Sequence, residues 1–293
     1  MDNRQNDRRS MLMIVSAMLI FGTIGLIRRF IPVSSAFLAF FRGISGGMIL
    51  LLFTRLKGYK DGEKSQGRTT FLLILSGAVI GVNWMLLFEA YNHTTVAVAT
   101  LCYYMQPTIV MLLSPLLFRE KLTARKTVCA AIAVAGMILV SGVTEEGSRQ
   151  AGHLQGVFLG LGAAVCYSTV VILNKKISGV DPYRKTTIQL LSAGAVMIPY
   201  MLLTGGFSTG EFSTTTVILL LAAGIIHTGF AYVLYFGSMD GLKAQSVAML
   251  SYIDPVTALL LSALILREPL SAAGLAGAVM IIGSAIAAEW RKE

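Results

Sequence analysis

The chain has 293 residues, of which 55% are hydrophobic and only 13% are charged, and its mean hydropathy is +0.72. A soluble domain carries about 25% charged residues, so this composition excludes an ordinary water-soluble fold. A net charge of +9 is compatible with a nucleic-acid partner, so the distribution of that charge along the chain decides whether it indicates one.

Ten apolar stretches follow one another, each close to the roughly 20 residues that a helix needs to cross a bilayer. In chain order they span residues 10–27, 36–54, 70–90, 96–118, 124–143, 153–173, 186–204, 214–237, 244–266 and 271–289. The connecting segments are too short to hold a soluble domain. We interpret the N-terminal stretch as an uncleaved first helix, because nine more follow it. The sequence therefore predicts an all-α polytopic membrane protein with ten transmembrane helices.

Lysine and arginine are distributed unequally between the two sides that ten crossings define. With the N-terminus in the cytoplasm, nineteen of these residues lie on the inner side and four on the outer side, and Arg42 lies within a span. This is the positive-inside pattern, and ten crossings return the C-terminus to the cytoplasm. The positive charge therefore indicates orientation, with membrane lipid as a partner and no nucleic acid.

Two passages of the sequence are related by a constant shift of 148 residues. One reads TLCYYMQPTIVMLLSPLLFREKL and contains Gln106 and Pro107; the other reads MLSYIDPVTALLLSALILREPL and contains Asp254 and Pro255. In each passage a proline interrupts an apolar stretch, and an Arg-Glu pair follows near its end. A copy displaced by half the chain length indicates an internal duplication.

The duplication divides the chain into a first repeat, residues 1–148, and a second, residues 149–293, with five predicted helices each. Since five is odd, the second repeat enters the membrane from the opposite side. This predicts two inverted five-helix repeats related by a pseudo-two-fold axis in the membrane plane. Secondary transporters use this arrangement because two similar halves can exchange inward-open and outward-open shapes around one central site. The alternative is a duplicated membrane scaffold without transport.

Asp254 is the most unusual polar residue, because it falls near the middle of the ninth span, directly before Pro255. A carboxylate at the bilayer centre costs about 2.5–3.5 kcal/mol on insertion scales unless it faces a polar cavity or a partner. Proline donates no backbone hydrogen bond, so the carbonyl of Ser251 is expected to lose its helical partner. A carboxyl group and a free carbonyl in one turn suit an ion, a proton or a cationic substrate. The alternative is a proline kink with a satisfied buried acid, and Gln106 in the first repeat has the same two interpretations.

Other polar and aromatic residues lie on equivalent faces of spans three, four, eight and nine. The further candidates for lining a cavity and binding a substrate are Asn83, Trp84, Tyr103, His227, Tyr232 and Ser251. His227 is also a candidate proton relay, which makes it, with Asp254, a predicted coupling residue. For each of these side chains the alternative is ordinary packing in the helix interior.

Arg42 has three interpretations: its side chain snorkels outward, pairs with a neighbouring acid, or contacts an anionic group. The sequence shows no phosphate-binding loop, no supported Ser-His-Asp arrangement and no cluster of metal ligands. Its three cysteines lie inside apolar spans. We therefore predict no catalytic residue, no metal and no cofactor, and an ion gradient or the gradient of the substrate as the energy source.

The paired passages, with a mid-span proline followed by REKL or REPL, resemble the drug/metabolite transporter superfamily, specifically its EamA type. The span count and the two five-span halves fit that family over nearly the whole chain. The resemblance implies a central cavity lined by helices one, three, four, six, eight and nine, and a small-metabolite substrate, often an amino acid or a related compound. Many relatives have an apolar or small residue where this chain has Asp254, a departure that favours dependence on a cation or a proton.

These features predict a secondary active transporter, an exporter or exchanger, that moves a small polar or amphipathic metabolite such as an amino acid or related amine by alternating access. We expect it in the plasma membrane, the inner membrane of a prokaryote, with a proton or another ion as coupling partner. A lipid-binding or lipid-flipping protein with a headgroup site around Arg42 is the alternative. An intramembrane enzyme is a third, disfavoured because the spans supply no nucleophile with a base.

Overall fold

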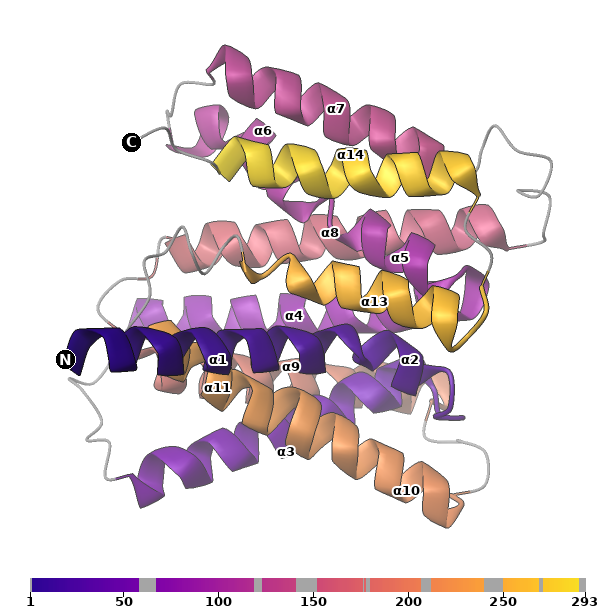
Figure 1. Cartoon of the computed structure of the whole chain (residues 1–293). Coiled ribbons are helices and arrows are strands. Elements are labelled where there is room, and N and C mark those ends of the chain that lie inside the picture. The colour runs from indigo at the N-terminus through magenta and orange to yellow at the C-terminus, as the bar shows by residue number, and fades with distance from the viewer. Residues whose placement is uncertain are drawn as a thin grey trace.

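The structure is a computed structural model of the chain. It describes residues 2–57, 67–118, 123–140, 152–175, 177, 180–206, 212–239, 250–268 and 271–289, and within these ranges the regular structure is entirely helical. The helices pack side by side in one bundle (Figure 1). The predicted boundary near residue 148 and the start of the ninth predicted span lie outside the described ranges.

Each predicted span contains helix. The elements are α1 (Asp2–Gly22), α2 (Ile24–Arg28), α3 (Ser35–Leu56), α4 (Gly67–His93), α5 (Val96–Tyr103), α6 (Gln106–Phe118), α7 (Ala124–Val140), α8 (His153–Lys175), α9 (Pro182–Thr204), α10 (Thr214–Leu221), the π-helix η2 (Ala222–Phe230), α11 (Ala231–Met239), α13 (Ile253–Leu264) and α14 (Ala272–Glu289). In the described ranges, seven helical segments are long and apolar enough to cross a membrane, and three shorter apolar helices accompany them. The chain is therefore an all-helical, multi-pass membrane protein.

Capping residues explain where several helices begin. The side-chain oxygens of Ser34, Thr95, Asp181 and Ser213 each accept a hydrogen bond from the backbone N–H three residues later, at the starts of α3, α5, α9 and α10. These are the residue types that best satisfy the free N–H groups of a first helical turn. Pro182 follows Asp181, at a position where a missing N–H costs nothing.

Within the described residues, three of the predicted spans are interrupted by a break in the helix. The fourth breaks at residues 104–105, just before Pro107, and in the ninth the turn at 251–252 precedes Pro255. The carbonyl of Ser251 is not free as predicted, because it accepts a hydrogen bond of 3.3 Å from the N–H of Asp254 in a tighter turn. The first span breaks at Thr23, without a proline.

Helices from the two halves of the chain pack directly on each other. α3 packs against α9 and α7 against α14, while α4 packs against α8 and α1 against α11 (Figure 1). At the crossing of α3 and α9, a Cβ on Gly47 would lie 2.7 Å from Leu191 Cδ2, and one on Gly194 would lie 2.8 Å from Ile44 Cδ1. Glycine allows this close approach of helices, as in other membrane bundles.

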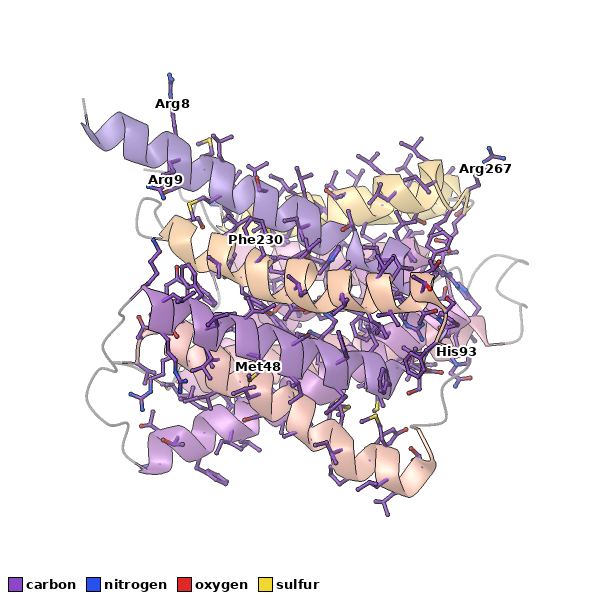
Figure 2. The ribbon with its side chains drawn as sticks, turned by 90° about the horizontal axis from the view of Figure 1, so that it is seen from below. Arg8, Arg9, Met48, His93, Phe230 and Arg267 are labelled. Atoms are coloured by element: carbon purple, nitrogen blue, oxygen red, sulfur yellow. The ribbon has the colours of Figure 1, made fainter. Side chains whose placement is uncertain are left out.

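The two ends of the bundle carry different polar residues. Arg8 and Arg9 lie at one end, and His93 and Arg267 at the other (Figure 2). At the second end Arg29 Nη2 forms an ion pair of 2.7 Å with Glu268. Glu268, the acid of the Arg-Glu pair in the second repeated passage, therefore has a structural partner. Glu120, the acid of the first pair, lies outside the described residues.

Candidate functional site

A cavity of about 330 Å³ lies where the interrupted helices meet. Its wall includes residues of α1, α2, α4, α5, α6, α8, α11 and α13, which form the spans that the family resemblance implies, and Arg42 of α3 in addition. Small-molecule pockets begin at about 300 Å³, so the cavity suits a small metabolite. Nine aromatic residues line it: Phe21, Trp84, Phe88, Tyr91, Tyr103, Tyr104, Tyr167, Tyr232 and Tyr235.

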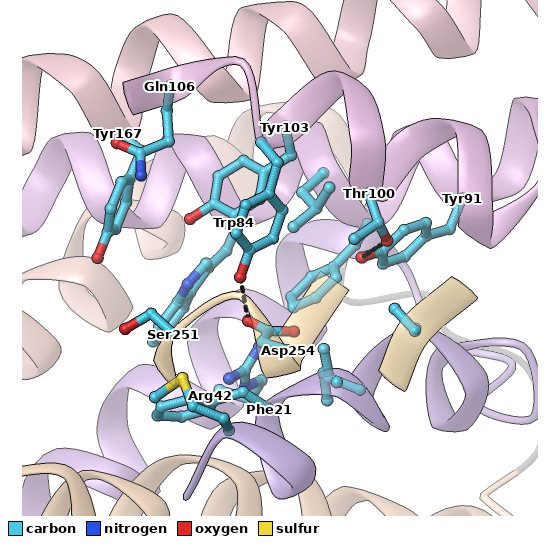
Figure 3. A pocket seen from close by; sticks show the side chains of 18 of the residues that line it. Phe21, Arg42, Trp84, Tyr91, Thr100, Tyr103, Gln106, Tyr167, Ser251 and Asp254 are labelled. Atoms are coloured by element: carbon cyan, nitrogen blue, oxygen red, sulfur yellow. Dashed lines mark hydrogen bonds between the residues drawn. The ribbon is translucent and has the colours of Figure 1, made fainter. Parts of the chain in front are cut away.

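Most of the residues predicted from the sequence meet at this cavity. Those that line it are Arg42, Trp84, Tyr103, Gln106, Tyr232, Ser251 and Asp254, several of which are labelled in Figure 3. Asn83 and His227 are not among the lining residues. Asn83 is fully buried, and its amide donates a 2.6 Å hydrogen bond to the carbonyl of Ala163 on α8, so it joins two helices instead.

Asp254 lies in the first turn of α13, directly after the break in the ninth span. The hydroxyl of Tyr104 donates a 2.6 Å hydrogen bond to its Oδ2 atom, the dashed line at Asp254 in Figure 3. A helix N-terminus favours a negative charge, and in the described part of the chain no cationic side chain pairs with this carboxylate. Asp254 is thus available to a cation or a proton in the cavity.

Arg42 approaches the cavity from α3 and is only 5% exposed, so it does not snorkel to the membrane surface. Its Nε atom donates a 2.9 Å hydrogen bond to the hydroxyl of Thr228, and its guanidinium lies over the ring of Trp84, 4.5 Å from the centroid, and near Phe88 at 5.3 Å. Aromatic faces stabilise a cation of this kind. No carboxylate pairs with Arg42 among the described residues.

Several lining residues escaped the sequence analysis. One of them is Tyr104, whose ring lies 5.7 Å from that of the predicted Tyr103. The ring of Tyr167 lies 5.7 Å from Tyr103 as well, so the three rings form one corner of the aromatic wall. Tyr104 was missed as a lining residue because an unbroken helix would turn it away from the face of Tyr103. The proline that follows both tyrosines is the signal that should have been used, since the break at residues 104–105 lets both side chains reach the cavity.

His227 lies beside the cavity wall, on η2. Its Nε2 atom lies 2.6 Å from the hydroxyl of Thr23, and its Nδ1 atom lies 3.1 Å from the carbonyl of Ala222. The hydroxyl of Thr23 also donates to the carbonyl of Ile20. His227 therefore joins the π-helix to the break between α1 and α2.

The arrangement offers binding and no evident bond chemistry. One carboxylate and one guanidinium face a small space with aromatic walls, and each is hydrogen-bonded to a hydroxyl, the carboxylate to Tyr104 and the guanidinium to Thr228. Among the described residues, no group of three or more His, Cys, Asp or Glu side chains is placed to hold a metal ion.

Comparison with known proteins agrees with this description. The chain is 28% identical over 252 residues to the uncharacterized transporter YxxF of Bacillus subtilis (strain 168), covering 86% of this chain and 80% of that one. It is 27% identical over 267 residues to the protein PecM of Dickeya dadantii (strain 3937), covering 88% and 84%. A protein of known crystal structure shares the fold, with a TM-score of 0.68 and 20% identity over 95% of this chain and 97% of that one.

A family model decides the classification. The model of the EamA-like transporter family matches twice, over residues 8–142 and 154–288, so each match covers nearly all of one predicted repeat. Together with the apolar helices and the names of the relatives, these matches place the chain among transporters and not among enzymes. The chain belongs to the EamA-like transporter family.

Proposed function

We propose that this protein is a secondary active transporter whose cavity binds a small zwitterionic metabolite, such as an amino acid, or a related amine. The observation that carries the proposal is the presence of two opposite charges, Asp254 and Arg42, in the wall of one cavity, neither of them in an ion pair with any residue that the structure describes. Burying an unpaired charge in a membrane protein is costly, so a substrate that supplies both counter-charges is favoured.

The positions of the two charged residues in the cavity wall suggest how the substrate is oriented. Its ammonium group would contact Asp254, near Tyr104, and its carboxylate would contact Arg42, whose guanidinium is held against Trp84. Arginine suits a carboxylate because its planar donors can bind both oxygens. The side chain of the substrate would lie against the remaining aromatic rings.

Alternating access is proposed from the relation between the two halves. Ile44 on α3 contacts Gly194 on α9, and Leu191 on α9 contacts Gly47 on α3. A shift of 147 positions turns Ile44 into Leu191 and Gly47 into Gly194, so it turns one contact into the other. This is expected for helices related by a pseudo-two-fold axis. This exchange supports two inverted five-helix repeats, ten crossings and a cavity that opens to each side in turn. The positive-inside pattern supports cytoplasmic termini. A prokaryotic inner membrane is proposed from the likeness to bacterial relatives, and export or exchange is proposed from the family resemblance alone.

Coupling to a proton or another ion is proposed at Asp254, the acid in the cavity wall. His227 is proposed as a second coupling residue, acting through its contact with Thr23 at the break between α1 and α2 and not through the cavity. The lipid-binding alternative is not favoured, because Arg42 is enclosed by Trp84, Phe88 and Thr228 and offers no headgroup site at the lipid surface.

Ligand binding by the purified protein tests the proposal. A thermal-shift screen would use the twenty common amino acids, the amine obtained by removing the carboxyl group of each, and the acid obtained by removing the amino group. We expect an amino acid to stabilise the protein more than either of its partial analogues, and to be moved across liposomes that contain the protein. Absence of stabilisation by every compound, or equal stabilisation by all three forms, would contradict the proposal.

A further inference from the structure

The crossing of α3 and α9 provides a register for comparing the halves. Their N-capping residues, Ser34 and Asp181, are 147 positions apart. The exchanged contacts at this crossing, described above, have the same shift. By this register the residue on α9 that corresponds to Arg42 is Gln189.

Two further glycines extend the comparison to α4 and its counterpart. A Cβ on Gly77 of α4 would lie 2.6 Å from the Cβ of Ser192 on α9. A Cβ on Gly224 of η2 would lie 2.9 Å from the Cβ of Ser45 on α3. Ser192 and Ser45 are themselves 147 positions apart, so Gly77 and Gly224 are equivalent, with the same shift.

One helical turn later the shift has changed. A Cβ on Gly81 would lie 2.8 Å from Cγ1 of Val196, and one on Gly229 would lie 2.7 Å from Cγ2 of Ile49. Val196 and Ile49 are 147 positions apart, but Gly81 and Gly229 are 148 apart. The second half therefore has one extra residue between its two contact glycines, and this residue falls in η2, the π-helix.

The π-helix is thus a one-residue insertion that the first half lacks. Insertions of this kind form single π turns, which occur frequently at functional sites. By the shift that holds at Gly81 and Gly229, the residue on α4 that corresponds to Thr228 is Ile80. The hydroxyl of Thr228 consequently has no counterpart in the other half, although both halves build the same helix crossing.

The hydrogen bonds of Thr228 determine where its hydroxyl donates and where it accepts. Thr228 is fully buried, and its hydroxyl donates a 2.9 Å hydrogen bond to the carbonyl of Ala223, five residues earlier. Because its single proton is used there, the oxygen presents a lone pair to Nε of Arg42, also at 2.9 Å. The guanidinium is therefore fixed on one edge by Thr228 and on its face by Trp84. Its Nη2 atom also donates a longer hydrogen bond of 3.5 Å to the carbonyl of His227, which leaves Nη1 and the second hydrogen of Nη2 for a substrate.

Gln189, which occupies the equivalent position in the other half, has different contacts from Arg42. The amide nitrogen of Gln189 donates hydrogen bonds of 2.8 Å to Ser76 and 2.7 Å to Asn174, and Gln189 does not line the cavity. A buried polar residue at this crossing can thus be satisfied entirely within the protein. Arg42 instead lines the cavity.

We propose that Thr228 is a positioning residue for Arg42: it fixes the guanidinium so that its Nη atoms meet the carboxylate of the substrate. The inference rests on the proposed function, since it requires that Arg42 binds a carboxylate. Thr228 itself does not line the cavity and would not touch the substrate.

The test compares phenylalanine with phenethylamine, which has the same side chain and ammonium group but no carboxylate; the strongest-binding amino acid and its amine replace this pair if phenylalanine does not bind. In Thr228→Val we expect affinity for the amino acid to fall on the order of tenfold, the effect of losing one hydrogen bond to a charged group. Affinity for the amine should stay within about twofold, because its ammonium group is bound elsewhere. Thr228→Ser, which keeps the hydroxyl, should restore binding of the amino acid.

Binding of the same two ligands is measured in parallel for Arg42→Gln. This variant tests the proposed function, whereas Thr228→Val tests the positioning role, so a failure of one proposal can be told from a failure of the other. Selective loss of the amino acid in Arg42→Gln but wild-type binding in Thr228→Val would overturn the positioning role and leave the proposed function standing. No selective loss in Arg42→Gln would overturn the proposed function. Equal weakening of both ligands by Thr228→Val would show general damage and also overturn the inference. We expect Thr228→Val to fold, because Ile80 occupies the equivalent position; Thr228→Ala is the substitute if it does not.

Discussion

The two proline breaks of the molecule share their geometry and differ in their chemistry. The break before α6 brings Gln106 to the cavity, and the break before α13 brings Asp254 to it, 148 positions later. At the crossing of α3 and α9 the charge is in the first half instead, because Arg42 of the first half corresponds to the neutral Gln189 of the second. Each half therefore contributes one charged residue to the cavity, of opposite sign, at a position where the other half is neutral.

This comparison separates the scaffold from the site. Shared features, such as the breaks and the glycine contacts, are explained by the packing of two similar bundles. The charges are not required by that packing, since each has a neutral counterpart in the same fold. A residue that departs from the symmetry is therefore a better functional candidate than one that follows it.

The largest effect is expected from Asp254→Asn. The amide keeps the shape of the side chain and an oxygen for the hydroxyl of Tyr104, but it removes the negative charge. We expect substrate affinity to fall on the order of 100-fold, the upper range for a hydrogen bond to a charged group. In liposomes, transport should also lose its dependence on a pH gradient. Retention of that dependence would contradict coupling at Asp254.

Arg42→Gln should have the next largest effect, with Gln189→Leu as its matched control. Removing the guanidinium should weaken binding of a carboxylate-bearing substrate roughly 30-fold, since a charge-assisted contact is lost. Gln189→Leu should leave affinity within about twofold, although it removes the hydrogen bonds to Ser76 and Asn174 and should lower stability by about 1–3 kcal/mol. Isothermal titration and thermal unfolding separate the two effects. Similar losses of affinity in both variants would argue that the halves do not differ as described.

Moving the acid between the halves should have a smaller effect. In the double variant Gln106→Asp with Asp254→Asn, the carboxylate occupies the equivalent position on α6, which also lines the cavity. We expect affinity to recover about tenfold relative to Asp254→Asn alone, because the charge is regained without the hydrogen bond from Tyr104. Binding no better than that of Asp254→Asn would mean that the two breaks are not interchangeable.

The sequence predicted the features that depend on local signals. Proline marked the breaks that precede Gln106 and Asp254, and apolar length marked the helices that carry these residues. Half of the predicted lining residues, namely Tyr103, Gln106, Ser251 and Asp254, lie close to those breaks. The interruption at Thr23 was not predicted, because no proline stands there and the apolar stretch reads as continuous.

Predictions that assumed a regular helical face were less successful. Asn83 was placed on a face equivalent to that of His227, one turn away, but it bonds to Ala163 on α8. The face of His227 was derived from 3.6 residues per turn, whereas η2 has one more residue than its counterpart. One residue corresponds to about 100° of helix rotation, enough to change which side chains reach a cavity. This insertion becomes visible only after the glycine contacts have fixed the register.

The smallest effect is expected from Gly47→Ala and Gly194→Ala, made as two separate variants. They test whether the crossing of α3 and α9 has pseudo-two-fold symmetry. The new Cβ would meet Leu191 in the first variant and Ile44 in the second, at 2.7 and 2.8 Å. Because these contacts are exchanged by the 147-residue shift, both variants should lose similar stability, about 1–3 kcal/mol for overpacking. Each should therefore show a fall of a few degrees in its thermal midpoint, while affinity for the substrate is retained. If one variant unfolds and the other is unaffected, the crossing of α3 and α9 does not have the self-complementary geometry on which the comparison of the halves depends.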